Sequence, residues 1–238
     1  MVQPVRAILF DLDGTLLDND MNLFLPRYFD LLTAHMEHLL PREEFMSRLM
    51  RATRKMLGND GSRTNEEAFA ADFYPLAGHS REKIEPLLLE FYAEKFPTLR
   101  QYTRPVPQAR QVVEMAFDLG YTVAITTNPL FPATAVQQRM EWAGVAGLPY
   151  RLVTSYENSR ATKPNLLYFE QTLDALGQPP QASLVVGDED MDMVAALLGC
   201  QTFLVPGPRT ELAAGTPPPT YEGRLAGVGD LLQSWHSG

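Results

Sequence analysis

The sequence contains a single cysteine, Cys200, among 238 residues. A lone cysteine excludes an intramolecular disulfide and a cysteine-based metal site, and this usage is typical of a reducing cytosol. No stretch approaches the roughly 18 consecutive apolar residues of a membrane-spanning helix. The first residues run straight into an apolar stretch without the cleavage pattern of a signal peptide. We therefore expect no membrane span, no export signal and a cytoplasmic location.

Positive charge is also scarce, since 20 Lys and Arg residues face 29 Asp and Glu residues, for a net charge of −9. This excess disfavours binding to nucleic acids and to anionic membranes, because both are polyanions. Small anions remain open as ligands if a metal or a local cation holds them. The sequence lacks the GxSxG, HExxH, P-loop and GxGxxG motifs of other enzyme classes.

Short apolar runs rich in β-branched residues predict buried parallel strands. They lie at residues 5–10, 121–126, 150–153, 183–186 and 202–205. Helical patterns follow, each closed by a glycine at the position of a left-handed helix end. They lie at residues 108–119, 133–143, 165–176 and 190–198, before Gly120, Gly144, Gly177 and Gly199. This alternation predicts an α/β fold with a doubly wound parallel sheet. A loop over 206–220 and a short final helix over 230–235 complete the expected chain.

Residues 18–103 show helical patterns and no strand pattern, which predicts an all-helical insertion. Two of the expected helices cover residues 22–40 and 42–57. A third begins at a capping box formed by Thr64 and Glu67, and a fourth follows Ser80. Prolines at 105 and 107 mark the return to the sheet. The predicted organisation is a core of residues 1–17 and 104–238 with an insertion of residues 18–103.

Two carboxylates, Asp11 and Asp13, follow the first strand in the run DLDGT at 11–15. Residues two apart point the same way, toward the crevice where parallel sheets bind ligands. Such a pair repels itself unless a cation or a proton lies between the two groups. The alternative interpretation is a strand-ending turn in which Asp13 caps a helix.

Three further groups follow later strands. Thr127 and Asn128 precede a helix N-terminus that favours an anion, although a simple helix cap would give the same pattern. Lys163 is the single lysine outside residues 18–103 and would otherwise be an ordinary surface lysine. The run GDEDMD at 187–192 places Asp188 and Asp192 at a strand end, where either a metal or an acidic first helical turn accounts for them.

These motifs together resemble the haloacid dehalogenase-like hydrolase superfamily. DLDGT at 11–15, TTN at 126–128, KP at 163–164 and GDEDMD at 187–192 occur in that family's order, each at a predicted strand end. The resemblance implies a Rossmann-like core, a helical cap domain in place of the insertion, and Mg²⁺-dependent phosphoryl transfer through an aspartyl-phosphate. The implied partner is a small phosphorylated metabolite, bound by a monomer or a homodimer.

The resemblance also implies residue roles. Asp11 would be the nucleophile, and Asp13 would protonate the leaving alcohol and then activate water. Thr127, Asn128 and Lys163 would bind the phosphoryl group. Mg²⁺ would be held by Asp11, the backbone carbonyl of Asp13, and Asp188. Asp192 would be a further metal-site candidate that orients a water or Lys163.

Asp13 favours phosphate esters over organic halides, because family members resembling the dehalogenases lack this carboxylate and their halide needs no proton. Two departures from phosphoglycolate-type relatives leave the substrate open: Pro129 stands where many carry lysine, and the return turn at 105–107 lacks a common glycine. The alternatives are a phosphomutase of the β-phosphoglucomutase kind, a non-catalytic binding module on the same fold, and a dehalogenase. A sugar phosphate, phosphoglycolate and a nucleotide all remain candidate substrates.

The insertion carries three patterns that favour ordinary structural roles. His35 and His38 share a helix face but have no apparent third metal ligand. Four basic residues form a stripe along one helix: Arg48, Arg51, Arg54 and Lys55. The stripe indicates a solvated helix face, and the alternative is that it binds the end of the substrate remote from the phosphate. Aromatic residues are expected to fill the core of the insertion rather than to stack on a substrate: Phe24, Tyr28, Phe69, Phe73 and Tyr74.

Overall fold

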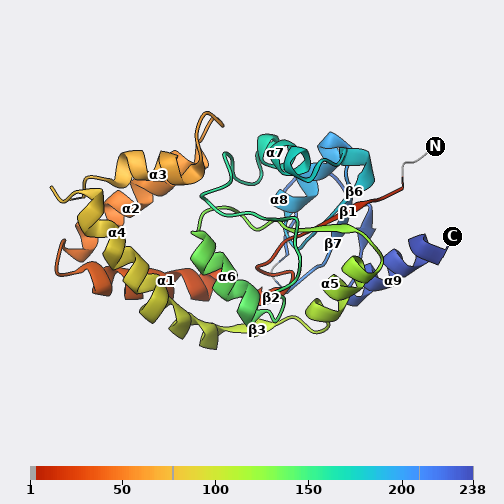
Figure 1. Cartoon of the computed structure of the whole chain (residues 1–238), viewed down its shortest axis with the longest axis horizontal. Helices are drawn as coiled ribbons and strands as arrows, with labels where there is room; N and C mark the ends of the chain where they lie inside the picture. The colour runs from red at the N-terminus through yellow and green to blue at the C-terminus, as the bar shows by residue number, and fades with distance from the viewer. Residues whose placement is uncertain (1–3, 77, 209, 238) are drawn as a thin grey trace.

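The computed structural model describes residues 4–76, 78–208 and 210–237, with a six-stranded sheet beside a mainly helical unit (Figure 1). The strand order is β5-β4-β1-β6-β7-β8, and all neighbours are parallel. The strands are β1 (Ala7–Phe10), β4 (Thr122–Ile125), β5 (Leu152–Val153), β6 (Ser183–Gly187), β7 (Gln201–Leu204) and β8 (Tyr221–Glu222). The sheet has the predicted doubly wound α/β form. The sequence did not predict β8, because two residues are too few to show a strand pattern.

Helices cover both faces of this sheet (Figure 1). In β1 the side chains of Ile8 and Phe10 pack in the cluster that contains α5 (Ala109–Asp118) and α9 (Leu225–Ser237). Ala7 and Leu9 pack on the opposite face, in the cluster that contains α7 (Leu166–Leu176). All four side chains are fully buried, which explains why β1 is a continuous apolar run rather than an alternating one.

The helical unit contains α1 (Met21–Met36), α2 (Arg42–Leu57), α3 (Asn65–Phe73) and α4 (Arg81–Glu90). A π-helical turn (Phe91–Lys95) and a 3₁₀ segment (Phe96–Tyr102) follow. The predicted capping box is present: the Glu67 amide donates to the Thr64 hydroxyl at 3.1 Å, and the Thr64 amide donates to the Glu67 carboxylate at 2.8 Å. Helix α1 ends earlier than the predicted residue 40, because the chain turns over residues 37–40 before Pro41.

A two-stranded antiparallel ribbon connects the two units. Its strands are β2 (Leu17–Asn19) and β3 (Thr103–Pro105), at the points where the chain leaves and re-enters the sheet-containing unit. The sequence did not predict these strands, since each has three residues and its partner lies far away along the chain. The boundaries expected at 17/18 and 103/104 fall inside this ribbon.

Two further helix predictions were wrong. Helix α9 begins at Leu225 rather than residue 230, although Gly227 and Gly229 disfavour a helix interior. A Cβ at Gly227 would lie 3.4 Å from the Phe203 ring, and one at Gly229 would lie 3.4 Å from the Met115 sulfur, so the glycines permit close packing. The segment 190–198 forms α8 (Asp190–Met193) followed by a 3₁₀ turn rather than one α-helix.

The left-handed glycine helix ends are as predicted. Their φ angles are +83° at Gly120, +74° at Gly144, +65° at Gly177 and +94° at Gly199. Within the described parts of the chain, no helix combines the length and the apolar character needed to cross a bilayer.

Candidate active site

Three neighbouring strands bring the predicted site residues to one edge of the sheet. β1 lies between β4 and β6, and Phe10 is in register with both Ile125 and Val186. The residues after these strand ends therefore meet at the carboxyl edge, where α/β sheets bind ligands. These residues are Asp11, Asp13, Thr127, Asn128 and Asp188.

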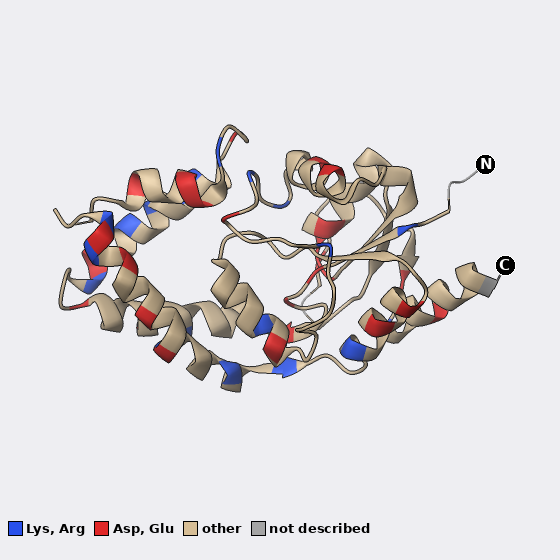
Figure 2. Cartoon of the chain, viewed as in Figure 1, with Lys and Arg blue, Asp and Glu red and all other residues tan. Residues whose placement is uncertain are grey.

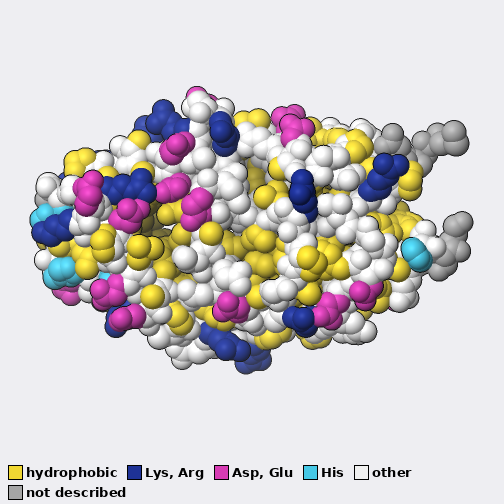
Figure 3. All heavy atoms as spheres, viewed as in Figure 1, with side chains coloured by type: hydrophobic (Ala, Val, Ile, Leu, Met, Phe, Trp, Pro, Cys, Tyr) yellow, Lys and Arg dark blue, Asp and Glu magenta, His cyan; other side chains and the backbone are white. Residues whose placement is uncertain are grey.

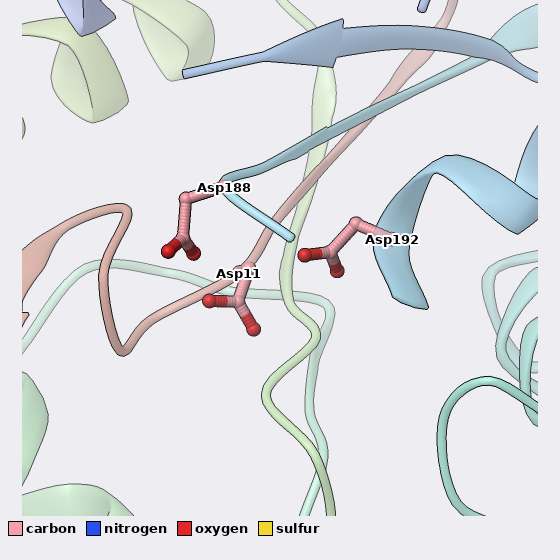
Figure 4. A group of neighbouring side chains, drawn as sticks. All are labelled: Asp11, Asp188 and Asp192. Atoms are coloured by element: carbon pink, nitrogen blue, oxygen red, sulfur yellow. The ribbon is translucent and has the colours of Figure 1, made fainter. Parts of the chain in front are cut away.

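A cluster of three carboxylates lies at this edge. Oxygens of Asp11, Asp188 and Asp192 all lie within 4.8 Å of one another. Figure 4 shows the side chains of Asp11 after β1, Asp188 after β6 and Asp192 from α8 pointing toward one another. Three like charges at this spacing need a cation or protons to be stable. No histidine joins such a group among the described residues, and His35 instead pairs through Nε2 with the Leu87 carbonyl.

Lys163 supplies a positive charge to the carboxylate cluster. Its ammonium group donates to Asp11 Oδ1 at 2.7 Å and also to Asp192 Oδ1. The side chain is 3% exposed, so the ordinary surface-lysine interpretation is wrong. A lysine placed between two carboxylates holds Asp11 in one orientation while leaving its second oxygen outside that hydrogen bond.

The backbone beside the cluster requires glycine at two positions. Gly14 has a φ of +89°, and a Cβ there would lie 2.1 Å from Asp188 Oδ2. A Cβ at Gly187 would lie 2.2 Å from Asp192 Oδ2. The glycines of the two motifs thus let the carboxylates lie directly against the chain. Asp188 is further positioned by the Thr15 hydroxyl, which donates to Oδ1 at 3.1 Å.

Asp13 lies apart from the three-carboxylate cluster. Its Oδ2 forms an ion pair with Arg139 from α6 (Ala133–Trp142), and its Oδ1 accepts from the Asn19 amide at 2.8 Å. The Thr127 hydroxyl lies 3.5 Å from Oδ2. The turn-and-cap interpretation does not describe this carboxylate, because its partners are side chains rather than helix amides. Ligation of a metal ion by the backbone carbonyl of Asp13 stays a prediction.

Sequence reasoning missed Arg139 and Asn19. Arg139 is 1% exposed, and its guanidinium lies 4.7 Å from the centroid of the Phe131 ring. Its Nη2 has no hydrogen-bond partner among the described residues. A detectable signal existed, because Arg139 shares the buried face of α6 with Ala135 and Val136 at helical spacing. Asn19 carried no such signal, since its position depends on the β2–β3 ribbon.

Thr127 and Asn128 follow β4 at the same edge of the sheet. Thr127 is buried, and its carbonyl accepts from the Thr154 hydroxyl at 2.8 Å and from the Tyr168 hydroxyl at 3.1 Å. Asn128 donates through Nδ2 to the Met191 sulfur at 3.8 Å, and its buried Oδ1 has no partner among the described residues. Polar side chains with unused hydrogen-bonding capacity therefore face a site that already holds acids and a lysine.

Burial dominates the electrostatics of the cluster. Desolvation raises the pKa of Asp11 well above its usual value, although Lys163 opposes this effect. Desolvation, with added repulsion from Asp192 and Glu189, raises the pKa of Asp188 to about 7. For Lys163 desolvation acts to lower the pKa, but attraction to Asp11 and Asp192 outweighs it and the pKa is raised. Without a metal ion, Asp11 and Asp188 thus hold protons more tightly than free acids do.

The arrangement combines three chemical capabilities in one crevice. Asp11 is a carboxylate fixed on one oxygen by Lys163 and faced by two further acids. Carboxylate oxygens are the ligands that hard divalent cations prefer. Asp13, held separately by Arg139 and Asn19, is a second carboxylate with different partners. Lys163 and Thr127 offer donors to an anion.

Comparisons with known proteins identify the family. The family model for haloacid dehalogenase-like hydrolases matches residues 5–198. The chain is 27% identical over 191 residues to phosphoglycolate phosphatase of Aquifex aeolicus, covering 80% of this chain and 79% of that protein. It is 26% identical over 201 residues to phosphoglycolate phosphatase of Mesorhizobium japonicum, covering 82% and 79% of the two chains.

Solved structures share the fold at lower identity. A HAD phosphatase from Thermococcus onnurineus aligns with a TM-score of 0.61 at 20% identity, covering 96% of this chain and 98% of that chain. The L-2-haloacid dehalogenase from Xanthobacter autotrophicus aligns with a TM-score of 0.56 at 17% identity, with the same coverage. The ordered motifs, the carboxylate cluster and the family match lead to one conclusion: the chain belongs to the haloacid dehalogenase-like hydrolase family.

Proposed function

We propose that the protein is a Mg²⁺-dependent phosphatase that removes phosphate from a small phosphomonoester through a phosphorylated Asp11. The observation that carries this proposal is the separation of two carboxylates with different partners. Asp11 is held by Lys163 within the acidic cluster, whereas Asp13 is held by Arg139 and Asn19. A phosphatase of this kind needs one carboxylate as nucleophile and a second one to transfer protons.

The residues present fit a magnesium ion. Asp11, Asp188 and the backbone carbonyl of Asp13 would hold it, and all three offer the oxygen ligands that Mg²⁺ prefers. Burial and repulsion from neighbouring acids raise the pKa of Asp11 and of Asp188, and Lys163 opposes both shifts. The bound ion would neutralise phosphoryl charge and orient the phosphate for in-line attack. Asp192 would act through its bond to Lys163.

In the first step, a carboxylate oxygen of Asp11 attacks phosphorus, forming a new O–P bond while the ester O–P bond breaks. Asp13 donates its proton to the leaving alkoxide oxygen, so the product leaves as an alcohol. In the second step, Asp13 removes a proton from water, which attacks the phosphorylated Asp11 at phosphorus. Inorganic phosphate leaves, and the Asp11 carboxylate is restored. Thr127, Asn128 and Lys163 bind the phosphoryl oxygens throughout.

The helical unit, proposed as residues 18–103, would act as a cap on a core of residues 1–17 and 104–238. Its support is a direct contact with the catalytic loops. Asn65 of α3 is fully buried and donates to the carbonyls of Pro129 and Ala161, which lie next to the predicted phosphate-binding residues. Exclusion of bulk water by such a cap favours transfer to Asp11 over side reactions.

Phosphate esters remain favoured over halides because Asp13 is present and positioned to transfer a proton. The dehalogenase structures share the fold with this chain and carry no argument about its substrate at 17% identity. A phosphomutase would use the same residues, but it would need a bisphosphate to phosphorylate Asp11. A binding module without activity would not need Asp11, Asp13 and Lys163 to be arranged together.

The test is phosphate release from a broad panel of phosphomonoesters, with Mg²⁺ and with EDTA. The wild type should release phosphate only with Mg²⁺, and Asp11→Asn should release none above background. Asp174→Asn removes the same charge at an exposed site on α7 and serves as the matched control. Release that persists in Asp11→Asn would contradict the phosphorylated-Asp11 route. Turnover that appears only with a bisphosphate primer would favour the mutase.

A further inference from the structure

A large apolar cavity lies between the helical unit and two loops of the sheet-containing unit. Its volume is about 380 Å³, within the range of sites for small molecules. Helices α1 to α4 form one side, and the segments after β4 and β5 form the other. Its wall includes Leu49, Phe69, Phe73 and Leu88. Figure 3 shows hydrophobic side chains gathered on this face between α2 and α3 above and α1 and α4 below.

Several aromatic residues expected to fill the core of the insertion line this cavity. Phe24 does pack in the core, with its ring 6.0 Å from that of Phe96. Tyr28 and Phe73 also belong to the buried core, and Phe69 and Tyr74 pack against it, as expected; all four contribute to the cavity wall as well. The rim is apolar as well, since Met50 is 37% exposed and Leu89 is 59% exposed. These residues offer apolar and aromatic surface to an occupant of the cavity.

The described wall of the cavity contains no lysine, arginine or histidine. Its charged residues are the three acids Glu66, Glu85 and Glu157. Arg81 pairs with Glu66 at 2.8 Å and with Glu85 at 2.6 Å, and the Ala133 amide donates to Glu157 at 2.9 Å. The wall therefore has no cation for a carboxylate or a second phosphate on the ligand.

The basic stripe of α2 does not supply that cation. Arg48 pairs with Glu44 at 2.9 Å, and Arg51 pairs with Asp72 at 2.7 Å. Neither arginine lines the cavity. Figure 2 shows basic and acidic residues close together along the helices of the helical unit, as expected of a solvated face.

The cavity begins close to the proposed phosphate-binding residues. Leu130, Phe131 and Pro132 form part of its wall, and Leu130 lies three residues after Thr127. Three residues of extended chain span at most about 11 Å, which limits the distance between Thr127 and Leu130. The Leu130 amide donates to the Asn128 carbonyl at 2.8 Å, and this turn makes the distance shorter still. The Phe131 ring faces the Arg139 guanidinium, which pairs with Asp13, and packs 5.3 Å from the Tyr28 ring.

We propose that the substrate is a phosphomonoester of a bulky apolar alcohol, alkyl or aryl, whose hydrocarbon part occupies this cavity. This inference rests on the proposed phosphatase function and names its substrate class. A two-carbon acid such as glycolate is too small to fill the cavity, and its carboxylate would meet acids rather than a cation. An apolar group of several carbons instead buries hydrocarbon against Phe69 and Leu49.

The test is kcat/KM for phosphate release from a series of n-alkyl phosphates, from ethyl to octyl, beside 1-naphthyl phosphate and 2-phosphoglycolate. We expect kcat/KM to rise with chain length by about fourfold per methylene until the cavity is full, as the transfer free energy of a buried CH₂ predicts. Values that are flat or fall with chain length would overturn the proposal. A higher kcat/KM for 2-phosphoglycolate than for every alkyl phosphate would also overturn the proposal.

A charge placed in the wall should abolish this preference. Thr53 lies on α2 in the cavity wall, and its hydroxyl donates to the Leu49 carbonyl at 2.9 Å. Thr53→Lys should lower kcat/KM for octyl phosphate at least tenfold and flatten the dependence on chain length. Thr98→Lys is the matched control, since Thr98 is exposed outside the wall and makes the same kind of bond, to the Lys95 carbonyl at 2.7 Å. An identical effect of both variants would overturn the proposal.

A binding measurement separates this proposal from the phosphatase function itself. Octylphosphonate has a carbon–phosphorus bond that the proposed reaction cannot hydrolyse. Calorimetry with Mg²⁺ should show that octylphosphonate binds the wild type at least tenfold more tightly than ethylphosphonate. Equal affinities would overturn the apolar-substrate proposal even if phosphate release is observed. Absence of release from every ester would contradict the phosphatase function, and the phosphonate affinities would still decide whether the cavity binds an apolar group.

Discussion

Asp13 has Arg139 on one carboxylate oxygen and Asn19 on the other. Both partners fix the position of the carboxylate beside Thr127. Asp11 instead accepts a hydrogen bond from Lys163. The site therefore holds two acids in different surroundings, which is how enzymes assign different roles to similar groups.

Replacement of Asp13 tests its role as the proton donor. Asp13→Asn should lower kcat for alkyl phosphates by about 10²- to 10⁴-fold, the usual contribution of general acid–base catalysis. The loss should be much smaller in the release of nitrophenol from 4-nitrophenyl phosphate, because nitrophenolate leaves without a proton. Rapid-mixing measurements of the first turnover would compare the two. Equal losses for both leaving groups would contradict the role of proton donor.

Removal of Arg139 should affect stability as well as activity. Arg139→Met leaves the nearly buried Asp13 carboxylate without its ion-pair partner, and we expect the free energy of unfolding to fall by about 3 kcal/mol. Arg110→Met is the control, because its pair with Glu114 is exposed and should contribute less than about 1 kcal/mol. Urea denaturation would measure both values. Similar small losses would show that Arg139 is not needed to compensate Asp13.

At the scale of elements, α3 connects the helical unit to the loops that follow β4 and β5. The amide of Asn65 donates to the Ser159 carbonyl at 2.8 Å, and the amide of Glu66 donates to the Tyr156 carbonyl at 2.8 Å. The side chain of Asn65 adds bonds to Pro129 at 3.2 Å and Ala161 at 3.1 Å. The first turn of one helix thus bridges two loops that follow neighbouring strands.

Loss of the Asn65 side chain should release this contact. Asn65→Ala leaves two buried carbonyls without their side-chain donor, which should lower the free energy of unfolding by about 1–3 kcal/mol. Hydrogen exchange should become faster in both α3 and residues 126–131. Thr64→Ala removes only the helix cap, costs about 1 kcal/mol, and should speed exchange in α3 alone. An identical exchange pattern in both variants would contradict the bridging role of Asn65.

Elements with a strong local signal were predicted well. The Thr64 and Glu67 capping box and the glycine-terminated helices are short-range features, because each depends on residues within one turn. The ribbon of β2 and β3 was missed, since its pairing joins residues on either side of the whole insertion. Helix α9 was placed too short because its glycines serve packing against Phe203 and Met115, which only the fold brings near.

At the scale of the whole molecule, three acidic side chains lie close together at one largely buried site. Asp11 and Asp192 are buried, and Asp188 is half-buried beside them. Lys163 compensates only part of this charge. The metal-free protein should therefore respond to both pH and Mg²⁺.

The pH dependence has a definite sign. The pKa of Asp188 is raised from 3.8 to about 7 on folding, so between these values the folded protein binds more protons than the unfolded chain. The free energy of unfolding of the metal-free protein should therefore be higher near pH 5 and fall as the pH rises through about 7. Urea denaturation in EDTA at pH 5.5 and pH 8 would measure the change.

Magnesium and Asp188→Asn provide the controls for this dependence. Mg²⁺ competes with protons for the carboxylates, so saturating Mg²⁺ should stabilise the protein more at pH 8 than at pH 5.5. Asp188→Asn should weaken the pH dependence measured in EDTA. An unchanged pH profile in this variant would show that Asp188 is not its source.

The sequence alone determined the fold class, the helical insertion and the group of residues that meet at one sheet edge. It could do so because parallel strands align their carboxyl ends, so residues at successive strand ends converge. Tertiary structure alone decided the partners of Asp13 and the apolar cavity. Arg139 lies 126 residues from Asp13 along the chain, and the cavity wall comes from four helices and two distant loops. Such contacts depend on how whole elements pack, and no local pattern encodes that packing.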